Sequence, residues 1–412
     1  MDRSKLLLTL LIGFLGACAS AQSPSQPTTV LLISLDGVRH DDLGSGNTPT
    51  LDRLSAEGAH AERLLPVFPT LTFPNHYSLA TGLHPGQHGI VGNTIYDPGF
   101  DATFKMGNSE VVDGRWWGGE PIWITAVRQG QRSATLFWPG SEAEIHGRRP
   151  TYWLKYDGRL SHADRVKQVL AWLDMPAEER PQFLTLYFSA NDSAAHEHGP
   201  GSEEQQAALR DIDTALGALV KGLEARESLD EIDLIVVSDH GMTEVSPERA
   251  VFLDDFVDVN NEAELVIWGA TSGIWPKAGR GEALLSALKA APLEHARVFA
   301  KEETPESWHF RDHVRVPPIV LVADEGWSIT TRSFHTPERT AHFKKGTHGF
   351  DPSLPSMHGI FLAHGPHFRA GASVPSLSAV DVYPLMAELL GLEPAENAGS
   401  LRASEALRSE GH

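Results

Sequence analysis

The sequence has a single cysteine, Cys18, and few basic residues for its length of 412. One cysteine excludes a disulfide framework and a cysteine-rich zinc module. Lysine and arginine number 34 against 54 aspartates and glutamates, which gives a formal net charge of −20. This acidic balance argues against binding to a nucleic-acid backbone. It is compatible with an enzyme that acts on anions if bound cations reverse the local field, and the 20 histidines could supply imidazole ligands for such cations.

The sequence also lacks a long apolar run. The run at residues 6–15 is too short to span a membrane, which requires about 20 apolar residues. Because Arg3 and Lys5 precede it and small residues follow it, residues 1–21 are predicted to be an export signal. Two processing sites overlap there, a lipoprotein box that ends at Cys18 and an ordinary signal-peptidase site. We therefore expect an exported protein, periplasmic or anchored by lipid at Cys18 to a bacterial envelope, with a linker at residues 22–27.

Beyond this linker, patterns of buried strands and helices alternate. Continuous apolar runs, which are typical of strands buried on both faces of a parallel sheet, occur at residues 29–35, 134–138, 183–188, 232–237 and 359–363. Helical periodicity is clearest at residues 204–224 and 376–390. This alternation predicts a doubly wound α/β fold, with a mostly parallel sheet and helices on both faces.

The stretch from residue 244 to 345 interrupts the alternation. It contains short strand candidates, a helix candidate near residues 281–290 and many prolines. We interpret it as an inserted α+β subdomain beside the site. The catalytic α/β domain would then consist of the two segments on either side, residues 28–243 and 346–395. Residues 396–412 would form a polar tail.

Acidic and imidazole side chains follow the predicted strands or lie in neighbouring loops. In a doubly wound fold, ligands bind outside the carboxyl ends of the strands, so these side chains are expected to meet. Three carboxylates and three imidazoles suit zinc or another transition metal better than calcium or magnesium. Each alone is a common turn residue, surface ion pair or helix cap, and only their coincidence predicts a metal site. The six residues are Asp36, Asp192, His196, Asp239, His240 and His348.

Thr72 follows an irregular loop and precedes a helical pattern at residues 75–81. At a helix N-terminus, backbone N–H groups and the helix dipole favour an anion, although the same position also suits an N-cap threonine. A threonine hydroxyl is a poor nucleophile near neutral pH unless a base or a metal activates it. Because the predicted metal ligands would supply this activation, Thr72 is a candidate nucleophile.

Several motifs resemble a known family. Thr-Phe-Pro-Asn-His-Tyr at 72–77, Thr-Gly-Leu-His-Pro at 81–85 and His-Gly-Ile at 88–90 closely resemble the nucleotide pyrophosphatase/phosphodiesterase family of the alkaline phosphatase superfamily. The Asp-Gly, Asp-x-x-x-His, Asp-His-Gly-Met and Thr-His-Gly motifs follow in the family's order. The resemblance extends over roughly residues 28–392. Together with the predicted export signal, it indicates a bacterial member of the family.

The resemblance implies two zinc ions per chain and a set of substrate contacts. Asn93 would hydrogen-bond a phosphoryl oxygen, and Phe73 and Tyr156 would sandwich a nucleobase. Leu71 departs from the vertebrate members, which commonly carry lysine before the nucleophile. One zinc ion would be held by Asp192, His196 and His348, and the other by Asp36, Asp239, His240 and the Thr72 oxygen.

The function implied is hydrolysis of phosphodiester or pyrophosphate bonds of nucleotides through a phospho-threonine, with release of nucleoside monophosphates. The expected partner is therefore a small nucleotide or phosphodiester. A choline phosphodiesterase of the same family is an alternative, because aromatic side chains also bind quaternary ammonium groups. A surface-tethered binding protein with a degenerate site is a further alternative from a different class. A sulfatase is excluded, since no Cys/Ser-x-Pro-x-Arg motif is present. The sequence does not predict the oligomeric state.

Overall fold

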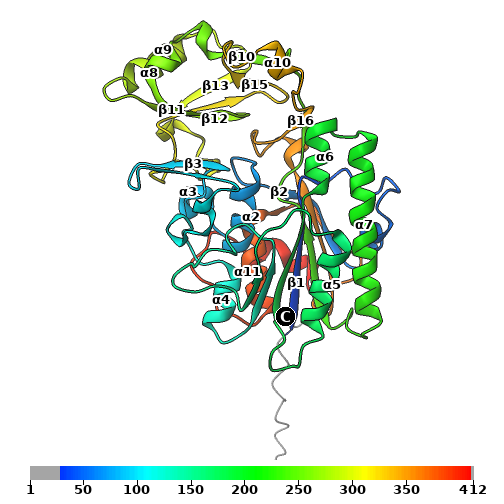
Figure 1. The fold of residues 1–412 in the computed structure, drawn as a ribbon. Helices are drawn as coiled ribbons and strands as arrows, with labels where there is room; N and C mark the ends of the chain where they lie inside the picture. The colour runs from blue at the N-terminus through cyan, green and yellow to red at the C-terminus, as the bar shows by residue number, and fades with distance from the viewer. Residues whose placement is uncertain (1–27, 410–412) are drawn as a thin grey trace, which may run out of the picture.

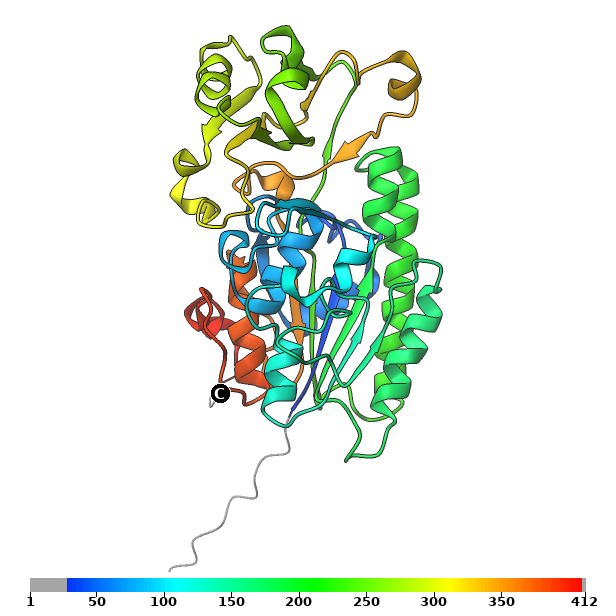
Figure 2. The same cartoon turned by 60° about the vertical axis from the view of Figure 1, so that its left-hand side comes forward.

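The computed structural model describes residues 28–409. The predicted export signal, Cys18 and the linker at 22–27 lie outside these residues. The described chain forms a body around a large sheet, with a smaller lobe above one end of that sheet (Figures 1 and 2). Among the helices of residues 28–409, none has both the length and the apolar character of a membrane span.

The central sheet has nine strands in the order β18-β2-β17-β8-β1-β7-β5-β6, and β19 also pairs with β2. The middle strands β1, β7 and β8 are parallel and buried almost throughout, which explains their unbroken apolar sequences. The bounds are β1 Thr29–Leu35, β2 Ala59–Leu65, β5 Ser133–Leu136, β6 Tyr152–Leu154, β7 Phe183–Phe188, β8 Ile232–Val237, β17 Gly359–His364, β18 Ala372–Val374 and β19 Leu377–Ser378.

Strand β17 runs against its neighbours, and this differs from the prediction of a parallel strand at residues 359–363. Phe361 pairs with Val237 of β8 and with Ala61 of β2, and both pairings are antiparallel. An apolar run records burial on both faces but carries no information on strand direction, so the sequence pattern could not show this. All other pairings in the sheet are parallel, which confirms the mostly parallel sheet.

Helices cover both faces of the sheet, as predicted. Alternate residues of β1 point to opposite faces, so Val30 and Leu32 join one core and Leu31 and Ile33 join the other. Figure 1 shows α2, α4 and α11 on one side and α5 and α7 on the other, and α1 packs with the second group. The bounds are α1 Pro49–Glu57, α2 Thr72–Thr81, α4 Ile122–Arg128, α5 His162–Leu173, α7 Glu203–Glu224 and α11 Val382–Leu389.

The two strongest helix predictions are borne out in different degrees. Helix α7 begins after Ser202, whose side chain accepts a hydrogen bond from the Gln205 N–H, and it matches the prediction at 204–224 closely. The pattern at 376–390 holds a shorter helix, because β19 and a 3₁₀ turn occupy its first part.

The stretch from residue 244 to 345 forms most of the upper lobe in Figure 1 and has a core of its own. Its four antiparallel strands have the order β11-β12-β14-β13, and α9 packs against β12 and β13. The chain leaves and re-enters the body through the antiparallel pair β9 and β16. The bounds are β9 Thr243–Glu244, β10 Ala250–Phe252, α8 Val259–Glu262, β11 Ala263–Ile267, β12 Thr271–Pro276, α9 Gly281–Ala290, β13 Ala296–Ala300, β14 Ile319–Ala323, β15 Ser328–Thr330, α10 Pro337–Thr340 and β16 Gly346–Thr347.

Shorter elements complete the fold. The end of the chain, predicted as a polar tail, includes a 3₁₀ helix whose Leu407 is fully buried. The remaining regular elements are α3 Pro85–His88, β3 Thr94–Asp97, β4 Ala102–Lys105 and α6 Ala190–His198. The 3₁₀ helices are Ser109–Val112, Gly114–Trp116, Leu253–Asp255, Lys301–Glu303, Glu306–Trp308, Pro355–Met357, Ala379–Asp381 and Leu401–Leu407.

Candidate active site

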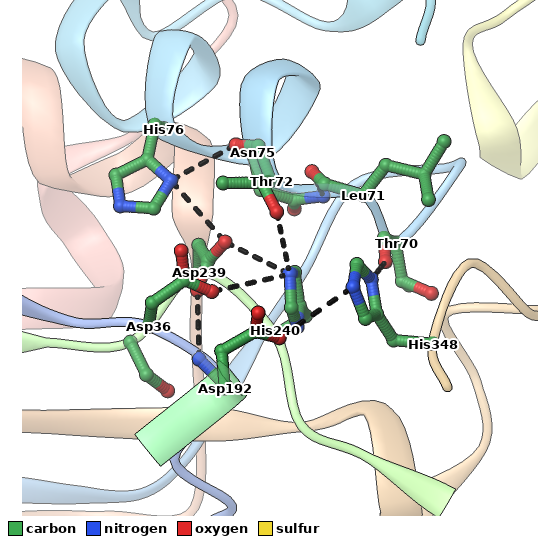
Figure 3. Close-up of polar contacts among 12 residues, drawn as sticks. Asp36, Thr70, Leu71, Thr72, Asn75, His76, Asp192, Asp239, His240 and His348 are labelled. Atoms are coloured by element: carbon green, nitrogen blue, oxygen red, sulfur yellow. Dashed lines mark hydrogen bonds and ion pairs between the residues drawn. The ribbon is translucent and has the colours of Figure 1, made fainter. Parts of the chain in front are cut away.

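The six predicted acidic and imidazole side chains meet at the carboxyl ends of β1, β7 and β8. Figure 3 shows Asp36, Asp192, Asp239, His240 and His348 among them. The parallel register of these strands brings Asp36, after β1, and Asp239, after β8, to the same edge of the sheet. Helix α6 follows β7 and places Asp192 and His196 one turn apart. His348 arrives from the other direction, directly after β16.

The first cluster consists of Asp192, His196 and His348. Oδ1 of Asp192 lies 3.4 Å from Nε2 of His196 and 3.6 Å from Nε2 of His348. The Nδ1–H of His196 donates to the Gly346 carbonyl at 2.7 Å, and that of His348 donates to the Thr70 carbonyl at 2.8 Å. These bonds fix the rings so that both Nε2 atoms face the carboxylate, as in metal sites whose histidines are oriented by outer hydrogen bonds.

The second cluster contains Asp36, Asp239, His240 and Thr72. Nε2 of His240 lies 2.9 Å from Asp239 Oδ2, 3.6 Å from Asp36 Oδ1 and 3.3 Å from Thr72 Oγ1. Its Nδ1–H donates to the Gly241 carbonyl at 2.9 Å. Asp36, His240 and Asp192 also offer ligand atoms within 4.8 Å of one another, so the two clusters adjoin.

A glycine makes this close approach possible. Gly37 has a φ of +69°, and a Cβ at this position would lie 3.0 Å from the Cβ of Asp192. The Gly37 N–H also donates to Asp239 Oδ1 at 3.2 Å. Any other residue would strain the turn and push the first cluster away from the second.

Three buried carboxylate oxygens in the two clusters accept no hydrogen bond from residues 28–409: Asp36 Oδ1, Asp192 Oδ1 and Asp239 Oδ2. Burial raises the pKa of Asp36, and the neighbouring Asp239 and Asp192 raise it further. Burial also raises the pKa of Asp192. Unpaired buried carboxylates are costly unless a cation compensates them. A donor set of carboxylates and imidazoles therefore fits two transition-metal ions.

Thr72 is the first residue of α2, and Leu71 holds the extended conformation of the N-cap position. The threonine is therefore not the cap, and its side chain is free to face His240, although the residue is only 8% exposed. Asn93 lies beside it, because its Oδ1 accepts the Phe73 N–H at 2.9 Å. This bond directs the two donor hydrogens of the Asn93 amide away from the helix.

Two residues of this centre carried no assigned role in the sequence analysis. His76 is fully buried, and its Nδ1 lies 2.9 Å from the Thr72 carbonyl and 3.2 Å from Asp239 Oδ2. Burial opposes the charged ring, but Asp239 outweighs it and raises the pKa of His76. The i, i+4 spacing from Thr72 was the available signal. Tyr187, near the end of β7, donates its hydroxyl to Asp36 Oδ2, and no sequence signal distinguished it from a packing residue.

Two cavities open on Thr72. The larger, of about 910 Å³, is also lined by Asn93, His348 and residues of the inserted stretch. The smaller, of about 330 Å³, is lined by Phe73 and Tyr156. Phe73 packs against Phe104 and Trp117, whereas the Tyr156 ring is half-exposed. The structure thus places the predicted aromatic pair in one cavity next to Thr72.

Comparison with known proteins agrees with this geometry. A family model described as type I phosphodiesterase/nucleotide pyrophosphatase matches residues 30–351. The chain is 38% identical over 400 residues to mouse ectonucleotide pyrophosphatase/phosphodiesterase family member 1, covering 93% of this chain and 43% of that protein. It is 35% identical over 401 residues to human family member 5, covering 97% and 82%. The chain therefore spans less than half the length of some relatives and most of another.

Solved structures show the same relationship. The chain is similar to murine ectonucleotide pyrophosphatase/phosphodiesterase 5, solved as an inactive threonine-to-alanine variant in complex with AMP, with a TM-score of 0.87 and 37% identity. The match covers 93% of this chain and 100% of that one. The human counterpart gives a TM-score of 0.87 and 36% identity. Together, the fold, the two Asp/His clusters and these matches show that the chain belongs to the type I phosphodiesterase/nucleotide pyrophosphatase family of the alkaline phosphatase superfamily.

Proposed function

We propose that this protein hydrolyses phosphodiester or pyrophosphate bonds of nucleotides through a covalent phospho-threonine at Thr72. The observation that carries the proposal is the Thr72 hydroxyl, 3.3 Å from His240 Nε2 and beside two adjoining clusters whose buried oxygens lack donors. The murine relative with bound AMP, inactive after a threonine-to-alanine change, supports the same chemistry.

The proposed cofactors are two zinc ions. Three imidazoles among six side chains favour zinc over magnesium or calcium. Asp192, His196 and His348 would hold one ion, and Asp36, Asp239, His240 and the Thr72 oxygen would hold the other. When bound, such a pair of cations lowers the pKa of a coordinated hydroxyl or water and neutralises charge on the attacking and departing oxygens.

In the first step, the Thr72 hydroxyl gives up its proton to solvent, Thr72 Oγ1 forms a bond to the phosphorus, and the bond from the phosphorus to the leaving oxygen breaks. The electron pair of that bond departs with the leaving group, while the nucleoside monophosphate stays on Thr72. In the second step, water attacks the phosphorus, and the Thr72 oxygen is released with a proton. Donor hydrogens of the Asn93 amide stabilise charge on the phosphoryl oxygens in both steps. His76 and Tyr187 act only as positioning residues, because they hold Asp239 and Asp36.

The smaller cavity supports a nucleotide as the substrate. Phe73 and Tyr156 present aromatic surface to one side of Thr72, and a nucleobase can stack on such surface. An arginine that could neutralise the extra charge of a phosphomonoester is missing from residues 69–78 and 91–94. We therefore expect diesters to be preferred over monoesters.

The test uses three variants and two substrates. Thr72→Ala should lower kcat on a p-nitrophenyl ester of AMP by several orders of magnitude while zinc content stays at two per chain. Thr72→Ser, which retains a hydroxyl, should keep measurable turnover, and Lys221→Gln on the exposed face of α7 should behave as wild type. Near-normal turnover of Thr72→Ala would contradict the covalent route. Equal hydrolysis of p-nitrophenyl phosphate would contradict the diester preference.

Export is a separate part of the proposal. The basic start, short apolar run and small residues of residues 1–21 support delivery to a bacterial periplasm or, through Cys18, to a lipid anchor. Mass spectrometry of the mature N-terminus decides between these routes. A lipid on Cys18 supports the anchor, cleavage after Ala21 supports the free form, and an intact Met1 would contradict export.

A further inference from the structure

The larger cavity beside Thr72 has positively charged side chains on the wall formed by the inserted stretch. These are Arg315, Lys344 and Lys345. The guanidinium of Arg315 is fully engaged, because it donates to Asp97 at 2.6 Å and to three backbone carbonyls. The two lysines differ, since neither forms an ion pair with a carboxylate among residues 28–409. Both are exposed and line the cavity, so a ligand in the cavity can reach them.

The position of Lys344 next to the first cluster follows from the backbone. The N–H of Lys345 donates to the His196 carbonyl at 2.9 Å, which ties this segment to the end of α6. Lys344 lines the same cavity as Asp192, His196 and His348. It therefore places a positive charge in the cavity that this cluster faces.

The two cavities present different chemistry to a substrate. Thr72 lines both of them, whereas Lys344 lines only the larger one and Phe73 and Tyr156 line only the smaller one. If the aromatic pair receives the nucleoside, as in the proposed function, the group that leaves the phosphorus occupies the larger cavity. Besides its apolar residues, that cavity offers this group the ammonium of Lys344, and its lining also includes the carboxylate of Glu197.

We propose that Lys344 is a specificity-determining residue that selects substrates whose leaving group is itself a phosphate or pyrophosphate anion. This inference rests on the proposed function and narrows its substrates to nucleoside triphosphates and dinucleoside polyphosphates. When the bond between the α-phosphorus and the bridging oxygen breaks, its electron pair stays on that oxygen, and the leaving group gains negative charge. The Lys344 ammonium stabilises this charge by a charge-assisted hydrogen bond and transfers no proton.

Position 71 offers a way to move the charge. Leu71 lines the same cavity as Lys344 but belongs to the N-cap of α2, so the two side chains come from different segments. A lysine introduced at position 71 would restore a cation to this cavity from a different segment of the chain. The Leu71→Lys change in a Lys344→Gln background therefore tests whether charge in the cavity, rather than the Lys344 side chain as a packing element, determines the selectivity.

The experiment compares kcat/KM for ATP with kcat/KM for the p-nitrophenyl ester of AMP, which shares the nucleoside but releases nitrophenolate. Lys344→Gln should lose about tenfold on ATP, as expected for one charge-assisted hydrogen bond, and about twofold or less on the ester. Lys344→Arg should retain the ATP rate, and Leu71→Lys should recover part of it in the Lys344→Gln protein. Higher ionic strength should reduce the difference between wild type and Lys344→Gln. Lys221→Gln, which removes one exposed charge far from the cavity, is the matched control.

The outcomes separate this inference from the proposed function. Equal loss on both substrates, or no loss on either, would overturn the role of Lys344 while hydrolysis by the wild type still stood. If the wild type cleaved neither substrate with two zinc ions bound, the proposed function itself would fail, and the inference would fail with it.

Discussion

The ion pair between Arg315 and Asp97 predicts how firmly the inserted lobe is attached to the body. Arg315 comes from the inserted stretch, Asp97 ends β3, and both side chains are about 95% buried. Arg315 donates to Asp97 Oδ2 at 2.6 Å, to the Trp116 carbonyl at 2.6 Å and to the Gly89 and Arg115 carbonyls at 3.1 Å. Arg315→Met removes all four contacts but retains the length of the aliphatic stem.

The expected cost follows from what the methionine leaves behind. Breaking a buried ion pair by removing one partner costs about 3–5 kcal/mol, because the remaining charge is buried without compensation. Asp97 keeps the Gly99 and Phe100 N–H groups on its other oxygen, so the lower part of this range applies. We therefore expect Arg315→Met to lower the free energy of opening between lobe and body by about 3 kcal/mol. By contrast, Arg332→Met breaks an exposed pair with Asp255 and should cost about 1 kcal/mol or less.

Native-state hydrogen exchange measures this free energy directly. Amides of residues 85–118 and 309–316, on the two sides of the contact, should exchange about a hundredfold faster in Arg315→Met, since 1.4 kcal/mol corresponds to a factor of ten. Amides of β1 and β8 in the central sheet should keep their protection. Unchanged exchange on both sides of the contact would refute the reasoning, and so would an equal effect in Arg332→Met.

The same contact determines whether the stability of the folded protein rises or falls with pH. Burial alone would raise the pKa of Asp97, but Arg315 and the Gly99 and Phe100 N–H groups outweigh it and lower the pKa below its ordinary value. A carboxyl group whose pKa is lower in the folded state stabilises that state above its unfolded pKa of about 3.9. The stability that the Asp97 carboxylate contributes should be lost as the pH falls below about 4. The Arg315→Met protein should lose less stability over the same pH range than the wild type.

Two further predictions concern the metal centre. Removal of the proposed zinc ions by a chelator should lower the melting temperature, because the buried oxygens of Asp36 and Asp192 then lack compensation, and added zinc should restore it; an unchanged melting temperature would contradict the site. His76→Phe keeps ring packing against Trp138 but removes the N–H beside Asp239, so we expect a 10- to 100-fold loss of zinc affinity or kcat. Normal values for both in a correctly folded His76→Phe protein would show that His76 does not position the centre.

The sequence predicted the parts of the site that depend on local pattern. Asp36 and Asp239 end apolar runs, and parallel strands bring their carboxyl ends to one edge, so their meeting follows from the fold class alone. Asp192 and His196 meet because one helical turn separates them. His348 was also expected at the site from its place among the loops, but no local pattern showed how it gets there, because its approach requires the β9–β16 pair that returns the chain from the inserted lobe.

Other features depend on contacts that leave no local trace. Arg315 and Asp97 lie 218 positions apart, and neither stands in a recognisable motif. Tyr187 is one more apolar residue in a buried strand until the structure shows its hydroxyl on Asp36. The direction of β17 is set by its neighbours, since a strand buried on both faces has the same composition whether it runs parallel or antiparallel.

The division of the substrate cavities explains why the inserted lobe matters to function. The body supplies Thr72, the aromatic pair and all six acidic and imidazole side chains, which are the residues proposed to bind the nucleotide and two cations. The wall with Lys344 comes from the stretch between β9 and β16, and the pair formed by Arg315 and Asp97 fastens that stretch to the body. If Lys344 selects the leaving group as proposed, catalysis and this selection depend on different segments, and Arg315→Met should weaken discrimination between ATP and the nitrophenyl ester before it abolishes turnover.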